Sequence, residues 1–366
     1  MVKIKTDVVV LGAGAIGLAI ARELSSMFRN LIVIEQERQI GSHTSSRNSE
    51  VIHSGIYYEN SPFKEKLCLE GKSLLYDYIQ KREIEFDNCG KLIFATKFSD
   101  VDYIYKIIEN SNRCGVAHTI LNTSQLNKFK DIIKPYEGVF INETSIFDSH
   151  NFLMSLEFDT RENDAIIALN TQLRSIHIEE SSVILDCNNN GENILIDANI
   201  VINALGHHAL DFLKDLYPEK YAEYENFYVK GHYFSHSLQL ENVPLLYPVP
   251  NELGLGVHLT KDLAGQVRFG PDTVPVASAS SYKPKVSKTQ FLQEINANFH
   301  SIQIDKISFS YSGIRPKLKK NSHIYSDFLI ATDLDGKLIS LVGIDSPGLT
   351  ASLAIGRHVK KIFSER

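Results

Sequence analysis

The sequence predicts an α/β fold in two interwoven parts, one built on a parallel sheet and the other, of α+β type, built on an antiparallel sheet. Three patterns predict it: a β-branched run with a glycine-rich turn near the N-terminus, alternating strands over residues 227–311, and a return to strand, turn and helix near the C-terminus. The chain of 366 residues is long enough for two or three domains.

Composition excludes several other classes of protein. Hydrophobic residues make up 43% of the chain and charged residues 22%, which is typical of a soluble globular protein. The net charge of −6 argues against a nucleic-acid-binding surface. The four cysteines contain no CxxC pair, so we expect neither a disulfide framework nor a metal site. No apolar run reaches the roughly 20 residues of a membrane span, and we expect a cytoplasmic protein.

The first element is a strand with the sequence DVVVL, followed at once by Gly12, Gly14 and Gly17 in the GxGxxG spacing. A helix follows with an apolar stripe that runs to Met27, and the next strand ends at Glu35. The glycines allow a tight turn, a close approach of a pyrophosphate and close helix–strand packing, while the acidic residue accepts hydrogen bonds from a ribose. The segment therefore predicts a Rossmann-like site for NAD or FAD, with NADP disfavoured.

The segment after this acidic residue separates the two cofactors. An NAD-dependent enzyme of this type would continue with regular βα units. Here residues 35–58 read EQERQIGSHTSSRNSEVIHSGIYY, without helical or strand periodicity before Glu50. Such a polar stretch is typical of a loop that crosses over a ligand, and its apolar end is unsuited to a fully solvated loop. FAD is therefore favoured over NAD.

Five blocks of sequence carry a resemblance to a known family. They read TSSRNSEVIHSGIYY (44–58), FKEKLCLEG (63–71), LLYPVPNELGLGVHLTKDLAGQVRFGPD (245–272), SGIRPKL (312–318) and LVGIDSPGLTASLAIG (341–356). With these blocks the chain resembles the L-2-hydroxyglutarate dehydrogenase/oxidase family, which are FAD-dependent flavoproteins of the D-amino-acid-oxidase-like (DAO) superfamily. The first block also resembles the corresponding loop of FAD-linked glycerol-3-phosphate dehydrogenases.

The resemblance implies two domains between which the chain passes more than once. In this fold a Rossmann-like FAD-binding domain is interwoven with an α+β substrate domain that has an antiparallel sheet. The FAD-binding domain is expected to comprise residues 1–88, 145–226 and 312–366, and the substrate-binding domain residues 89–144 and 227–311.

The chain departs from the resembled family at a few places. Family members usually have glycine where Glu50 stands, alanine where Ser54 stands and glutamate where His232 stands. The segment after GPDTVPVAS (270–278) is also shorter here. These departures leave the flavin-binding pattern intact and bear on the substrate.

The resemblance also implies which residues bind FAD. In the C-terminal block, Gly343, Pro347 and Gly348 form a turn, and the helix after it would present its N-terminal amides to the pyrimidine edge of the flavin. We expect non-covalent FAD, the alternative being a histidyl link through His53. The full set of expected FAD-binding residues is Gly12, Gly14, Ala15, Ile16, Gly17, Glu35, Gln36, Thr44, Ser45, Ser46, Arg47, Asn48, Ser49, Leu173, Ala204, Gly206, Gly313, Arg315, Gly343, Pro347, Gly348, Leu349 and Thr350.

Arg315 is expected to hold a substrate carboxylate, because a guanidinium grips a carboxylate through two parallel hydrogen bonds. In the resembled superfamily the matching arginine anchors the substrate carboxylate. His258 and His53 are the two candidates for the base that takes the hydroxyl proton, since imidazole titrates near neutral pH. The other expected substrate-binding residues are Tyr57, Tyr247 and Lys230.

The activity implied by the resemblance is FAD-dependent oxidation of an L-2-hydroxy acid, first of all L-2-hydroxyglutarate to 2-oxoglutarate, with hydride transfer to flavin N5. The reduced flavin would pass its electrons to a quinone or to oxygen. A quinone would bring the protein to the inner membrane as a peripheral protein, for which the basic last helix (Arg357, Lys360, Lys361) is a weak indication.

Other readings of the sequence stay open at this point. The enzymatic alternatives are oxidation of glycerol 3-phosphate or of an amino acid. The non-enzymatic alternative is a flavin-binding subunit of a larger complex, although the presence of Arg315, His53 and His258 favours an enzyme. The oligomeric state is open as well.

Overall fold

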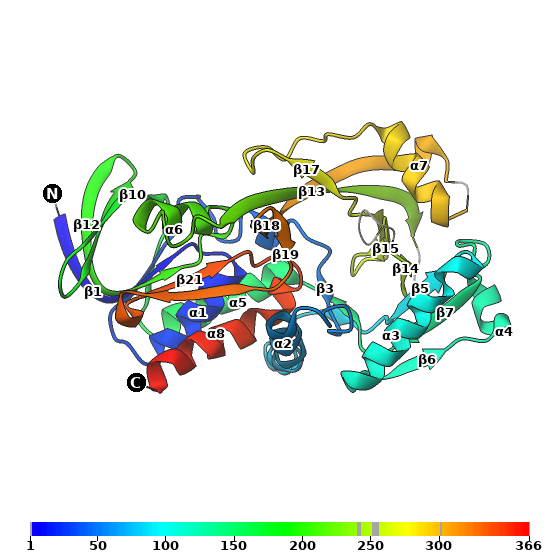
Figure 1. Cartoon of the computed structure of the whole chain (residues 1–366), viewed down its shortest axis with the longest axis horizontal. Coiled ribbons are helices and arrows are strands. Elements are labelled where there is room, and N and C mark those ends of the chain that lie inside the picture. The colour runs from blue at the N-terminus through cyan, green and yellow to red at the C-terminus, as the bar shows by residue number, and fades with distance from the viewer. Residues whose placement is uncertain (1, 240–242, 251–255, 301, 366) are drawn as a thin grey trace.

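The computed structural model describes residues 2–239, 243–250, 256–300 and 302–365. Two parts lie side by side: an α/β part that holds both ends of the chain and a second part built on another sheet (Figure 1). Two long strands, β13 (Tyr224–Gln239) and β18 (Ile307–Lys320), extend from the first part into the second.

The α/β part is built on an eight-stranded sheet with a parallel centre. Its strand order is β10-β11-β12-β1-β2-β9, with β21 also paired to β12 and β20 to β21. The strands are β1 (Val2–Leu11), β2 (Leu31–Ile34), β9 (Ile166–Ala168), β10 (Thr171–Ile178), β11 (Val183–Asn189), β12 (Glu192–Asn203), β20 (Leu329–Asp333) and β21 (Leu338–Val342). The β-branched runs of the sequence form β1 and β2, which pair in parallel as expected for buried strands.

Helices cover both faces of this sheet. They are α1 (Ala15–Ser25), α2 (Pro62–Lys81), α5 (Ser149–Glu162) and α8 (Gly348–Ser364) on one face and α6 (Ala209–Leu216) on the other. Val8 and Val10 pack with the first group and Val9 and Leu11 with the second, because successive side chains of a strand point to opposite faces. Helix α1 ends two residues before the end of the predicted stripe, so Met27 is exposed rather than part of the core.

The second part is built on a ten-stranded sheet with the order β19-β18-β13-β16-β15-β14-β5-β7-β6 and β17 paired to β13. Its other strands are β5 (Lys91–Ala95), β6 (His118–Ile120), β7 (Glu137–Ile141), β14 (Leu245–Pro248), β15 (Leu259–Lys261), β16 (Gln266–Phe269), β17 (Val274–Val276) and β19 (His323–Tyr325). The described pairings are antiparallel, as predicted, except that β14 runs parallel to β5. Helices α3 (Val101–Arg113), α4 (Thr123–Leu126) and α7 (Lys288–Asn298) pack against this part.

Short elements lie where the chain passes between the two parts. A three-stranded sheet has the order β3-β8-β4, with β3 (Val51–Ile52), β8 (Ser145–Phe147) and β4 (Phe86–Asp87). Single 3-10 turns are η1 (Thr44–Ser46), η2 (Phe98–Asp100), η3 (Asn127–Phe129), η4 (Gly206–His208), η5 (Ile304–Lys306) and η6 (Leu334–Gly336).

The expected domain boundaries at residues 227 and 312 fall inside β13 and β18. These strands pair with each other from residues 224 and 320 at one end to residues 236 and 307 at the other. Residues 312–320 therefore share a sheet with residues 307–311. The division of the chain into two discontinuous domains stays a prediction.

Candidate active site

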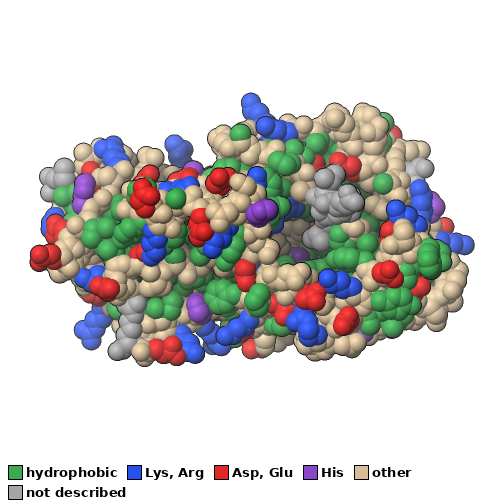
Figure 2. Space-filling view, viewed as in Figure 1, with side chains coloured by type: hydrophobic (Ala, Val, Ile, Leu, Met, Phe, Trp, Pro, Cys, Tyr) green, Lys and Arg blue, Asp and Glu red, His purple; other side chains and the backbone are tan. Residues whose placement is uncertain are grey.

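A cavity of about 1380 Å³ lies between the two parts and is lined by residues of both. The molecular surface is hollowed between the parts in the space-filling view (Figure 2). Most residues expected at the site line this cavity: Gly12, Gly14, Ala15, Ile16, Glu35, Gln36, Thr44, Ser45, Arg47, Asn48, Ser49, His53, Tyr57, Leu173, Ala204, Gly206, Tyr247, His258, Gly313, Arg315, Pro347, Gly348 and Leu349. The expected residues that do not line it are Gly17, Ser46, Lys230, Gly343 and Thr350.

Two residues of the second group support the cavity wall from behind. A Cβ atom at Gly17 would lie 1.9 Å from the carbonyl oxygen of Gly12, so only glycine lets α1 pack this close to the turn. The hydroxyl of Thr350 accepts a hydrogen bond from the His53 N–H (3.1 Å) and donates one to the carbonyl of Val51 (3.2 Å). These residues position the wall without facing the cavity.

The glycine-rich turn has the geometry of a dinucleotide cradle. Gly12 has φ +99°, and a Cβ atom there would lie 2.7 Å from the carbonyl oxygen of Ala204. The carboxylate of Glu35 accepts hydrogen bonds from the backbone N–H groups of Ala13 (2.8 Å) and Glu37 (3.0 Å). These bonds fix the carboxylate at the rim of the cavity, where its remaining lone pairs can accept from a ribose.

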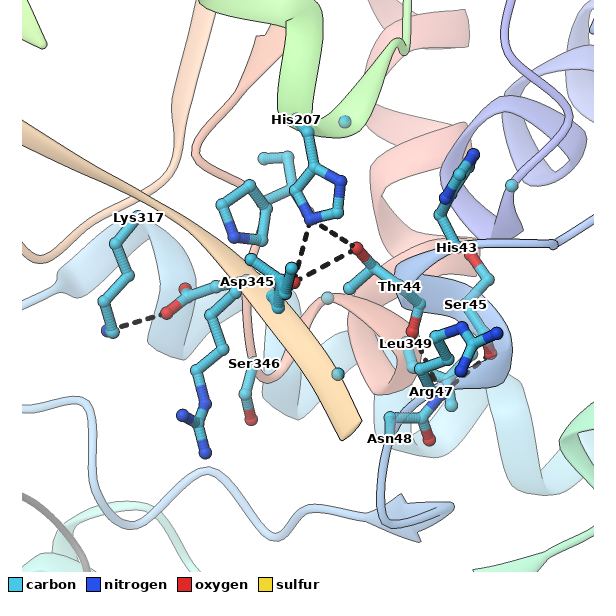
Figure 3. Close-up of a pocket in the computed structure, with 18 of the residues that line it drawn as sticks. His43, Thr44, Ser45, Arg47, Asn48, His207, Lys317, Asp345, Ser346 and Leu349 are labelled. Atoms are coloured by element: carbon cyan, nitrogen blue, oxygen red, sulfur yellow. Dashed lines mark hydrogen bonds and ion pairs between the residues drawn. The ribbon is translucent and has the colours of Figure 1, made fainter. Parts of the chain in front are cut away.

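Three segments that are far apart in sequence meet beside this turn (Figure 3). A Cβ atom at Gly313 on β18 would lie 2.1 Å from the carbonyl oxygen of Arg47, so glycine permits the close approach of the loop. His207 donates from Nε2 to the carbonyl of Ile314 (2.9 Å), and the same nitrogen lies 3.2 Å from Thr44 Oγ1. Sequence reasoning missed His207, whose only signal was its place directly after the expected contact at Gly206.

A segment of the second part, residues 277–287, crosses to this loop. We call it the strap; it joins β17 to α7. The Tyr282 hydroxyl lies 2.9 Å from His43 Nδ1, and the guanidinium of Arg47 lies over the Tyr282 ring, 4.1 Å from its centroid. Ser312 Oγ donates to the Tyr282 carbonyl (2.6 Å). The strap therefore links both parts at the edge of the cavity.

The face of β13 that does not line the cavity contacts the end of the strap that leads into α7. His232 is fully buried; its Nδ1–H donates to the carboxylate of Asp272 (2.8 Å), and its Nε2 accepts from the backbone N–H of Lys285 (2.9 Å). Lys230 donates from Nζ to the Lys283 carbonyl (2.8 Å). The expected substrate role of Lys230 is thus not supported. Lys230 and His232 are two positions apart, so their side chains point to the same face of β13, the face that contacts the strap.

Arg315 reaches the cavity from the inner face of β18. Its Nη1 makes one long hydrogen bond to the Asp272 carbonyl (3.4 Å), and it has no ion pair with any residue that the structure describes. A Cβ atom at Gly231 would lie 3.3 Å from Arg315 Nη2, so the glycine leaves the guanidinium its space. An unpaired guanidinium beside a cavity is a site for a carboxylate or phosphate.

The two candidate bases line the same cavity from different parts of the fold. His258 is buried and stacks on the ring of Tyr247, with a centroid distance of 3.6 Å and an interplanar angle of 12°. His53 Nε2 lies 3.3 Å from Ser346 Oγ, whereas its buried Nδ1 has no hydrogen-bond partner among the described residues. Burial, and after it the charge of Lys91, lowers the pKa of His53 to about 3. The His53 imidazole is therefore neutral at physiological pH, and the same burial makes it a weak base.

An ion triad of Asp345, Lys64 and Lys317 holds the turn before α8, and Figure 3 shows its Asp345–Lys317 pair. Asp345 pairs with Lys64 of α2 (2.8 Å) and with Lys317 of β18 (2.7 Å). Burial alone would raise the pKa of Asp345, but the two ammonium groups outweigh it and hold the pKa below its usual range. The triad fixes the start of α8, whose first residues line the cavity.

These residues fit a flavin dinucleotide. The turn at Gly12 places the N-terminus of α1 at the cavity, where a helix favours phosphate. Arg47 lines the cavity, and its buried Nε has no hydrogen-bond partner among the described residues, as expected for a cation beside a site for an anion. When bound, FAD supplies a ring that accepts a hydride.

Among the described residues, no helix is both long and apolar enough to cross a bilayer.

Comparisons with known proteins agree with this geometry. The sequence profile of the family described as "FAD dependent oxidoreductase" (DAO) matches residues 7–362. The mitochondrial L-2-hydroxyglutarate dehydrogenase of Arabidopsis thaliana is 32% identical, over 99% of this chain and 84% of that protein. A glycerol 3-phosphate dehydrogenase of Caloramator mitchellensis is 25% identical, over 98% of this chain and 73% of that protein.

A solved structure confirms the predicted fold. The dithionite-reduced L-alpha-glycerophosphate oxidase of Mycoplasma pneumoniae, with FAD bound, superposes with a TM-score of 0.87 at 24% identity, covering 98% of this chain and 95% of that one. The predicted preference for FAD over NAD is confirmed by the family match, which spans almost the whole chain. The chain belongs to the DAO family of FAD-dependent oxidoreductases.

Proposed function

We propose that the protein oxidises L-2-hydroxyglutarate to 2-oxoglutarate with FAD as hydride acceptor. The observation that carries the proposal is the guanidinium of Arg315, which has no ion pair among the described residues, in a cavity that His53 and His258 also line. The 32% identity to a plant L-2-hydroxyglutarate dehydrogenase over 99% of the chain supports the same substrate. The catalysed change is the loss of a hydride from the α-carbon and of a proton from its hydroxyl group.

Each residue of the proposed site has one task. Arg315 binds the carboxylate next to the reacting carbon through its two terminal nitrogens and so fixes the position of that carbon. His53 or His258 accepts the hydroxyl proton at an imidazole nitrogen, which requires the neutral form of the ring. Burial keeps His53 in that form. Tyr57 and Tyr247 wall the substrate end of the cavity.

The electron acceptor is a quinone or oxygen, and a quinone requires contact with a membrane surface. The basic side chains on α8, Arg357, Lys360 and Lys361, are the surface that this contact would use. In the absence of such contact the protein acts in the cytoplasm. Oxygen consumption and reduction of a soluble quinone analogue, measured with the same substrate, distinguish the two acceptors.

Glycerol 3-phosphate is the second candidate substrate. It is favoured by the superposition on an L-alpha-glycerophosphate oxidase and by the 25% identity to a glycerol 3-phosphate dehydrogenase. Arg315 would then bind the phosphate group, since a guanidinium binds both anions.

Anaerobic titration of the flavin with a panel of substrates tests the proposal. L-2-hydroxyglutarate is expected to bleach the yellow absorbance, whereas L-lactate, glycerol 3-phosphate and amino acids leave it in place. Bleaching by glycerol 3-phosphate alone would establish the second candidate. Full FAD occupancy without bleaching by any of them would instead establish a non-catalytic flavin-binding subunit.

A further inference from the structure

Lys91 is a buried cation with no counter-ion among the described residues, and it lies against two rings that line the cavity. It stands at the start of β5, its side chain has no exposed surface, and none of the described residues makes a hydrogen bond to its Nζ. No carboxylate of the described residues pairs with it. The ammonium contacts two aromatic rings instead, with Nζ 4.5 Å from the ring centroid of Tyr57 and 5.0 Å from that of Tyr247.

These ring contacts do not offset the burial of the charge. A cation–π contact recovers only part of the free energy that the removal of an ammonium from water costs. The imbalance lowers the pKa of Lys91 to about 7, mainly through burial. Lys91 is thus a cation to which none of the described residues offers an anion.

The rings that cover Lys91 also offer hydrogen-bond donors to the cavity. Tyr57, Tyr103 and Tyr247 line it, and we call these three residues the tyrosine wall. None of their hydroxyls makes a hydrogen bond among the described residues. Burial raises the pKa of Tyr57 well above its usual value, and the nearness of Tyr103 and Tyr247 raises it further. The three phenols are therefore neutral donors gathered in one place.

We propose that the tyrosine wall, with Lys91 behind it, binds a second carboxylate of the substrate, at the end distant from the reacting carbon. This inference rests on the proposed function, in which Arg315 holds the first carboxylate. The phenol hydroxyls donate to the distant carboxylate, and Lys91 compensates its charge through the low-dielectric rings. The site thereby selects 2-hydroxy dicarboxylates over 2-hydroxy acids that end in a methyl group.

Binding of two unreactive acids tests the inference without turnover. Glutarate and pentanoate have the same five carbons and differ only in the second carboxylate. Their dissociation constants follow from the absorbance change of bound FAD. The wild-type holoenzyme is expected to bind glutarate more tightly, and K91M to lose this preference at least tenfold. The thermal midpoint of K91M is expected to rise, because an apolar side chain replaces an unpaired charge.

K72M is the matched control. Lys72 lies on α2, mostly buried, and like Lys91 it lowers the pKa of Cys68, so both ammonium groups are near that thiol. It pairs with Glu143 and does not line the cavity. K72M is therefore expected to keep the wild-type preference for glutarate.

The double variant Y57F/Y103F keeps the rings of residues 57 and 103 and removes only their hydroxyls. It tests the inference even if K91M does not fold. Its preference for glutarate is expected to fall at least fivefold. An unchanged preference in either K91M or Y57F/Y103F, or no preference in the wild type, would overturn the inference. The proposed function is judged separately, by whether L-2-hydroxyglutarate bleaches the wild-type flavin.

Discussion

Arg315 is the side chain on which the proposed chemistry depends most directly. Arg315→Lys keeps the charge but loses the two-pronged contact, so KM for the 2-hydroxy acid is expected to rise on the order of tenfold. Arg315→Met is expected to lose most turnover, because the carboxylate then enters the cavity without a compensating cation. Steady-state kinetics with FAD content measured in parallel checks both variants. A KM change that follows FAD occupancy would show that Arg315 is structural.

The lowered pKa of Lys91 predicts how the stability of the folded protein depends on pH. Its pKa of about 7 in the folded protein lies below the ordinary value of 10.5, so between these pH values the unfolded chain binds one more proton. Lys91 therefore contributes stability that rises with pH in this window, with a slope on the order of 1 kcal/mol per pH unit. K91M lacks this rise, and its stability advantage is expected to shrink from pH 7 to pH 10.

The groups that face Lys91 do not titrate in that window. The pKa of His53 is lowered to about 3, that of Cys68 is raised to about 12, and those of Tyr57 and Tyr247 are raised, each mainly by burial. Urea unfolding of the wild type and K91M at pH 7, 8.5 and 10 measures the difference. A constant difference across these three pH values would contradict the assigned pKa.

Single residues were predictable from the sequence where local spacing determines their role. Gly12 and Glu35 belong to one strand–turn–helix–strand unit, whose geometry follows from short-range pattern. Lys230 and Lys91 were not predictable in the same way. Each lies in an apolar strand, and only the fold decides whether its side chain faces the strap, the cavity or the tyrosine rings.

At the scale of elements, the packing of α2 on α8 controls the turn beside the cavity. A Cβ atom at Gly71 of α2 would lie 2.5 Å from the carbonyl oxygen of Thr350 and 2.6 Å from Cα of Ala351. Gly71→Ala is therefore expected to push α8 outward, to destabilise the protein by about 1–3 kcal/mol and to weaken FAD binding. Urea unfolding and FAD fluorescence measure the two effects.

An exposed position on the same helix provides the control for this prediction. Lys66→Ala, on the solvent side of α2, is expected to change stability by less than about 0.5 kcal/mol. Equal stabilities of the Gly71→Ala and Lys66→Ala variants would show that α8 can move without cost.

Elements formed by local pattern were predicted well, and their pairing less so. The strands expected over residues 227–311 are present, and so are the strand and helix expected near the C-terminus, β21 and α8. The parallel pairing of β14 with β5 joins residues about 150 positions apart, and neither strand carries a signal for its partner's direction.

At the scale of the whole molecule, the strap is one of the links between the two parts that flank the cavity. Tyr282→Ala removes both the ring under Arg47 and the hydroxyl beside His43. The FAD dissociation constant is expected to rise by about tenfold, since such contacts contribute about 1–2 kcal/mol together. Fluorescence of released flavin measures the constant. Tyr282→Phe keeps the ring, and we expect a smaller effect; equal effects of the two variants would show that the ring contributes nothing.

His232 and the shortened strap have a consequence for engineering. His232 stands where the resembled family usually has glutamate, and it contacts both Asp272 and the backbone of Lys285 in the strap. A carboxylate at position 232 would face the carboxylate of Asp272 and could not serve both partners, because it has no proton to donate. His232 and the strap are thus coupled through the backbone of Lys285. A chimera that grafts a longer strap from a relative has to carry the residue at position 232 with it.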